Sequence, residues 1–167
     1  MMKAILLIFV VSLITAGCSN ETINIELRDN LISKIDTASH RKVPGYTSVV
    51  TLDAFFQGNF DDASFAPNID NNHTGIQEIY KRLQEIRAKN EVSDIFVEIT
   101  DVMFENEKSL GDKWPFSWTI YIVTSADDST VLNWTKSLEP ENTVGAEPIP
   151  DSIQVGKNQR VVTIWWD

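Results

Sequence analysis

Apolar and polar residues alternate in four stretches of the chain, and this repeat of two predicts β-strands. In the longest stretch, Ile95, Val97 and Ile99 fall on one side, and Glu98 falls on the other. The stretches are also rich in Val, Ile and Thr, which favour strands. The strands are therefore expected over residues 46–52, 92–102, 116–124 and 160–166.

Apolar residues at helical spacing predict two main helices between these strands. The first begins after Thr74, where Gln77 completes a capping box. The second begins after Ser125, which forms a capping box with Asp128, and it ends before Pro140. The inward faces are expected to carry Ile76, Ile79, Tyr80, Leu83 and Ile86 in the first helix and Val131, Trp134 and Leu138 in the second.

The resulting order is β-α-β-β-α-β, which predicts an α+β fold of the ferredoxin-like class. Four antiparallel strands would form the sheet, and both helices would cover one of its faces. The more apolar positions of the strands are expected under the helices: Val50, Leu52, Ile95, Val97, Ile99, Trp118, Ile120, Ile122, Val162, Ile164 and Trp166.

The opposite face of the sheet is the predicted interaction surface. It carries Phe96, Tyr121 and Trp165 among Thr and Glu residues. Large aromatic side chains on an uncovered face are typical of protein-binding surfaces. The alternative is that the loop over residues 141–158, or a short helix predicted over 25–37, folds across this face and buries it.

The first 18 residues have the features of an export signal. Lys3 is the only charge before an apolar run over residues 4–14, and this run is too short to span a membrane. Thr15-Ala16-Gly17-Cys18 follows, and Cys18 is the only cysteine in the chain. This segment resembles the lipobox of bacterial lipoproteins, although Thr15 stands where Leu is preferred. The alternative is an ordinary secreted protein in which Cys18 is a free thiol.

The lipoprotein resemblance implies that cleavage follows Gly17 and that Cys18 receives a diacylglycerol thioether. The protein would then be held in the bacterial cell envelope by acyl chains, and two or more chains make release slow. In a host with two membranes, Ser19 after the cysteine, in place of Asp, favours the periplasmic side of the outer membrane. The chain would divide into a signal peptide over residues 1–17, a lipidated tether over 18–45 and a single domain over 46–167.

Composition limits the partners of the mature protein. The formal charge is −10, and removal of Lys3 with the signal peptide leaves −11. Such a surface repels nucleic acid and attracts basic proteins, so no nucleic-acid partner is expected. With one cysteine, the domain has no internal disulfide and depends on packing. As a coil, the tether would reach on the order of 30 Å.

No stretch of the sequence has the full spacing of a catalytic or metal-binding motif. Residues 70–75 begin like a calcium loop, but Lys81 stands where a bidentate Glu is required. The two histidines, His40 and His73, have no partner at zinc-ligand spacing, and no cofactor is predicted. The carboxylates that remain open for an enzyme include Asp61, Asp62 and Glu98.

Three short aromatic motifs carry a second resemblance. They are Phe55-Phe56-x-Gly58-Asn59, Trp114-Pro115-Phe116 and Trp165-Trp166-Asp167. Their order over residues 43–167 resembles a small bacterial family of uncharacterised proteins, some of which resemble toxin-immunity proteins. The sequence leaves three functions open: a lipid-anchored, non-enzymatic envelope binding module, an acidic immunity or inhibitor lipoprotein against a basic exported toxin or hydrolase, and a carboxylate-dependent envelope enzyme.

Overall fold

A computed structural model describes most of the chain after the predicted export signal. The signal peptide and Cys18 lie outside the described residues. Within the part that is described, no helix is long and apolar enough to cross a membrane. The described residues are 22–35, 48–66, 75–102, 111, 113–141 and 149–166.

The four-stranded antiparallel sheet is confirmed, but the ferredoxin-like strand order is wrong. Neighbouring strands follow the chain in the order β1-β2-β3-β4, and every pair is antiparallel. A split βαβ fold instead needs helices that connect parallel strands. Here β2 returns directly beside β1, with Val50 opposite Val97. The strands are β1 (Ser48–Thr51), β2 (Val92–Ile99), β3 (Thr119–Thr124) and β4 (Arg160–Trp165).

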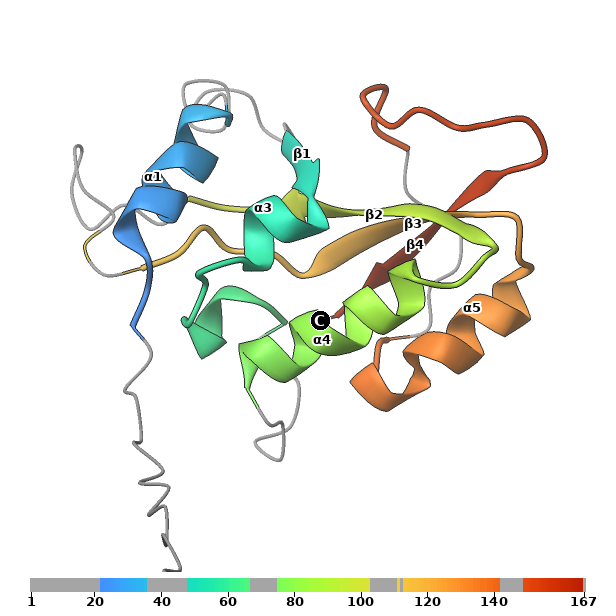
Figure 1. The fold of residues 1–167 in the computed structure, drawn as a ribbon, viewed down its shortest axis with the longest axis horizontal. Helices are drawn as coiled ribbons and strands as arrows, with labels where there is room; N and C mark the ends of the chain where they lie inside the picture. The colour runs from blue at the N-terminus through green and yellow to red at the C-terminus, as the bar shows by residue number, and fades with distance from the viewer. Residues whose placement is uncertain are drawn as a thin grey trace, which may run out of the picture.

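Helices cover one face of this sheet, as predicted. Figure 1 shows α3, α4 and α5 on the same side of the strands, whereas α1 lies at one end of the molecule. The connection between β1 and β2 contains α3, a 3-10 turn and α4, so it is longer than a single crossover helix. The elements are α1 (Ile25–Ser33), α3 (Leu52–Phe56), η1 (Asp62–Ser64), α4 (Ile76–Arg87), α5 (Asp128–Thr135) and η2 (Lys136–Leu138).

The main core lies between the helices and the face of the sheet that the alternation predicted. Ile95, Val97 and Ile99 of β2 are fully buried there, together with Ile120 of β3. Trp118 is the exception, because its side chain is 41% exposed although it was expected under the helices. The alternation of apolar and polar residues therefore assigned the faces of the strands correctly, but it failed just before the beginning of β3.

The helix caps differ from the predicted capping boxes. Gly75 is the N-cap of α4 and gives no side-chain cap; the backbone N–H of Ile76 donates instead to Asp62 Oδ1 at 2.8 Å. Gln77 donates to the backbone carbonyls of Phe56, the last residue of α3, and of Asn59 rather than to its own helix terminus. In α5 the cap is Asp127, which accepts from the backbone N–H of Thr130 at 2.7 Å. Asp62 therefore supplies α4 with an N-terminal acceptor from another segment.

Helix α1 packs as part of the domain, whereas the prediction placed a short helix within a tether over residues 18–45. Leu31 is 1% exposed and belongs to the main core, as does Ile35. The buried Arg28 guanidinium donates to the carbonyl of Gly111, far along the chain. The folded domain therefore begins near the N-terminus of α1 and not after residue 45.

Candidate functional site

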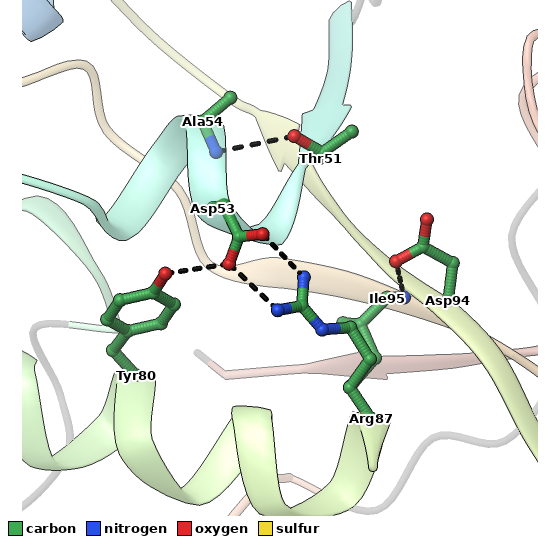
Figure 2. A network of polar contacts seen from close by, with 7 residues as sticks. All are labelled: Thr51, Asp53, Ala54, Tyr80, Arg87, Asp94 and Ile95. Atoms are coloured by element: carbon green, nitrogen blue, oxygen red, sulfur yellow. Dashed lines mark hydrogen bonds and ion pairs between the residues drawn. The ribbon is translucent and has the colours of Figure 1, made fainter. Parts of the chain in front are cut away.

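The most densely bonded group of ionisable side chains joins α3 to α4 (Figure 2). Arg87 donates from both terminal nitrogens to the two carboxylate oxygens of Asp53, at 2.9 Å each. The Tyr80 hydroxyl donates to Asp53 Oδ1 at 2.7 Å. We call these three residues the Asp53 clamp. Thirty-four positions separate Asp53 from Arg87, so no local spacing in the sequence indicated the pair.

The clamp holds its groups in protonation states that suit structure rather than catalysis. The two hydrogen bonds from Arg87, reinforced by Tyr80, hold the pKa of Asp53 below its usual range. Burial and the hydrogen bond to Asp53 raise the pKa of Tyr80 to about 12. A carboxylate whose oxygens already accept several hydrogen bonds is a poor base, and a tyrosine with this pKa is a poor nucleophile. The role of the clamp is therefore to link the two helices.

Alkaline pH is expected to weaken this clamp. An unperturbed tyrosine titrates near pH 10, so the contribution of Tyr80 is complete below about pH 10 and is lost as the pH rises toward about 12. The free energy of unfolding from urea titrations should therefore fall over this interval by more in the wild type than in Tyr80→Phe. Parallel curves for the two proteins would contradict a role for the phenol.

Asp61 and Asp62, proposed as candidate enzyme carboxylates, are engaged in backbone capping. Asp61 accepts from the N–H of Ala63 at 3.1 Å with one oxygen and from the N–H of Trp114 at 3.1 Å with the other. Asp62 caps α4 through the N–H of Ile76. These bonds fix the loop between α3 and α4 against the segment before β3.

Glu98, the third candidate carboxylate, lies on the other side of the sheet from these two. Its side chain accepts a hydrogen bond from the Tyr121 hydroxyl, because the two residues lie on the same face of neighbouring strands. Among the described residues, no three His, Cys, Asp or Glu side chains gather in a way that could hold a metal ion. His40 and His73 lie outside the described residues. The structure thus does not bring the predicted carboxylates together.

The predicted interaction surface is partly covered. Tyr121 is only 2% exposed and forms a small second core with Val123 and Ile153. Phe96 packs against this cluster and remains half-buried, as does Trp165. The segment after residue 148 crosses this face, so the alternative in which the 141–158 loop covers it is correct for Ile153. Phe96, Tyr121 and Trp165 therefore do not form an open aromatic face.

Trp118 is the most exposed aromatic residue among the described ones. Its ring packs edge-on against Phe116, with the centroids 5.5 Å apart. The backbone beneath the pair is held by hydrogen bonds from Phe116 N–H to the carbonyl of Asp101 at 2.8 Å and from Trp166 N–H to the carbonyl of Trp118 at 2.9 Å. We call Trp118 and Phe116 the Trp118 surface. Phe116 is only 8% exposed, so the Trp118 ring supplies the exposed apolar area, and the hydrogen bonds hold the backbone beneath it.

A groove between α1 and α3 is the second candidate surface. Its volume is about 240 Å³, below the range of pockets that enclose a drug-sized ligand. Leu27 and Leu31 supply apolar lining, and Lys34 and Asp53 lie at its edge. The Asp53 carboxylate is already bonded to Arg87 and Tyr80, so the polar lining left to a ligand includes Asn30, Lys34 and Gln57.

The three aromatic motifs of the sequence meet in the interior. Phe56 stacks on Tyr80 with centroids 5.4 Å apart, and Phe65 packs edge-on against Trp166 at 5.0 Å. Trp114 is buried in the same core. The buried aromatic side chains of the three motifs therefore contribute to packing, whereas Trp165 is half-buried and the neighbouring Trp118 is exposed.

The comparison with known proteins agrees with the resemblance carried by these motifs. Residues 26–164 match the family described as "Uncharacterized protein YfbO family". The chain belongs to the YfbO family. The matched region of this YfbO-family chain begins inside α1, so α1 lies within the part that defines the family.

A curated relative gives the same family assignment. The "Uncharacterized protein YfbO" of Escherichia coli (strain K12) is 30% identical over 123 residues, which cover 71% of this chain and 82% of the relative. No solved structure matches the chain. The segment that resembles a lipobox precedes the residues matched by the family, so lipid attachment to the YfbO-family protein stays a prediction.

Proposed function

We propose that this YfbO-family protein is a lipid-anchored, non-enzymatic binding module of the cell envelope, with the Trp118 surface as its contact site. The observation that supports this contact site is the 41% exposure of Trp118, which lies directly before the first residue of β3. Exposed Trp side chains are frequent anchors of protein interfaces, because they bury a large area at small conformational cost. The anchor rests on the resemblance of residues 15–18 to a lipobox.

The net charge of the protein suggests the kind of partner. A net charge of −10 favours a basic protein and accelerates its association at low salt. An acidic immunity or inhibitor lipoprotein is therefore the sharper form of this proposal. The alternative of a carboxylate-dependent enzyme has less support, since Asp61 and Asp62 cap backbone groups and Glu98 lies across the sheet.

Trp118→Ala is expected to abolish partner binding while the domain stays folded. The full-length protein, expressed with its own signal, would be cross-linked in intact envelopes and its adducts compared between variants. Trp134→Ala is the matched control, because Trp134 is half-buried on α5, where it lies against Lys89. A discrete adduct should form with the wild type and the control, weaken with added salt, and disappear with Trp118→Ala.

Three outcomes would count against this proposal in different ways. An adduct that persists in Trp118→Ala would rule out the Trp118 surface as the contact site. If the adduct were lost in Trp165→Ala but not in Trp118→Ala, the contact site would lie on the opposite face of the sheet. The absence of any discrete adduct with the wild type would contradict the binding module itself.

A further inference from the structure

We infer that the α1 end of the domain is held close to the membrane, and that its surface partner there is the lipid bilayer. This inference rests on the proposed anchoring at Cys18. It goes beyond that proposal because it fixes which end of the domain faces the lipid. The argument depends on where the folded domain begins and on how firmly α1 is attached to it.

The first firmly held residue is Asn24. Its backbone N–H donates to the carbonyl of Gly58 at 2.9 Å, and its side chain accepts from the N–H of Leu27 at 3.1 Å. Only six peptide steps separate Asn24 from Cys18. Since an extended chain spans at most about 3.6 Å per residue, this link can reach about 22 Å. A tether that ran to residue 45 would have a limit of about 97 Å.

The link to Cys18 would become longer if α1 detached from the domain, but detachment would disrupt the core. Leu31 and Ile35 are buried in it. Arg28 adds a hydrogen bond to the carbonyl of Gly111, outside the helix. Detachment would expose two large apolar side chains, which costs about 1.5–3 kcal/mol for each. The short link is therefore the dominant state.

The exposed side chains of α1 indicate what holds this end at the lipid. Ile25, the first residue of α1, is 44% exposed and is suited to contact with the apolar boundary. Glu26 and Asp29 are exposed acidic residues, which anionic headgroups do not attract. Acyl chains rather than charge must supply the attachment. Because α1 and α5 lie at opposite ends of the long axis in Figure 1, α5 faces away from the anchor.

Fluorescence quenching on vesicles tests this orientation. The lipidated full-length protein would be reconstituted into vesicles of phosphatidylcholine and phosphatidylglycerol that contain a headgroup-level quencher. One fluorophore would be placed at Glu26→Cys and, in a matched protein, at Asn133→Cys, because both residues are exposed, on α1 and α5 respectively. The label on α1 should be quenched severalfold more strongly than the label on α5.

A flexible insertion separates the short link from other causes. About 25 Gly and Ser residues placed between Ser19 and Asn20 should remove most of the difference between the labels. Equal quenching without the insertion, or an undiminished difference with it, would overturn the inference. Wild-type protein that does not float with vesicles, or that behaves like Cys18→Ser, would instead overturn the proposed anchor.

Discussion

Replacement of Trp166 by alanine is expected to lower the free energy of unfolding by about 3–5 kcal/mol. The side chain is 2% exposed, and its ring packs against Phe65. Its indole Nε1–H donates a buried hydrogen bond to the backbone carbonyl of Leu138 at 2.7 Å. Truncation to alanine therefore also leaves this acceptor without its partner. Because domains of this size are stable by about 5–15 kcal/mol, the substitution should remove a large part of the stability of the domain.

Urea titration of three variants separates the causes of this loss. Trp166→Phe keeps most of the ring and loses the hydrogen bond, so its loss should be smaller, about 1–3 kcal/mol. Trp118→Ala is the matched control, because the same substitution at an exposed ring creates no cavity and should cost less than about 1 kcal/mol. Equal losses at Trp166 and Trp118 would contradict the assignment of one to the core and the other to a contact surface.

The contrast between these two tryptophans shows what the alternation of residues could and could not predict. Both fall on the helix-covered face by parity, and Trp166 is buried there. Trp118 lies before the first residue of β3, where the sheet ends. Parity gives the face of a strand, but it does not say where the covering helices stop. Exposure of Trp118 therefore depended on tertiary structure that the pattern does not contain.

The strand order failed for a related reason. Alternation indicated the four strands, and helical spacing placed the two main helices between them with small errors at their ends. The same sequence of elements is compatible with more than one pairing of strands. The additional α3 and η1 between β1 and α4 allow the chain to return antiparallel beside β1. Local patterns specify elements, whereas pairing depends on how long connections pack.

Non-local contacts also explain why the site was predicted only in part. Asp53 and Arg87 form the clamp across two helices, and Ile153 covers Tyr121 from a loop. None of these contacts has a signature in local spacing. Helix α1 was predicted, but its narrow apolar stripe did not show that Leu31 would enter the main core. Burial of that residue is what shortens the link to Cys18.

Gly58→Ala is expected to destabilise the domain chiefly at α1. Gly58 has φ of 76°, a left-handed conformation that costs other residues about 1–3 kcal/mol. A Cβ there would also lie 2.8 Å from Asn24 Cβ and 2.8 Å from Leu27 Cδ1, closer than carbon atoms approach. Since Asn24 also donates to the Gly58 carbonyl, the substitution strains the contact that fixes the beginning of α1.

Hydrogen exchange distinguishes local from general loss of stability. In Gly58→Ala, the α1 amides should exchange faster than those of β2 and β3. Gly156→Ala is the matched control: its Cβ would meet only the side chain of Gln159, nearest at Oε1, which is flexible, and its φ lies outside the left-handed region. This control should leave stability unchanged or slightly increased.

If Gly156→Ala lost as much stability, or if α1 exchanged no faster than the sheet, Gly58 would not be the residue that fixes α1. The outcome bears on the anchor as well. A domain whose α1 detaches has a longer link to Cys18, so the quenching difference between the ends should shrink in Gly58→Ala as it does with a flexible insertion. Stability at α1 and position at the membrane are therefore expected to change together.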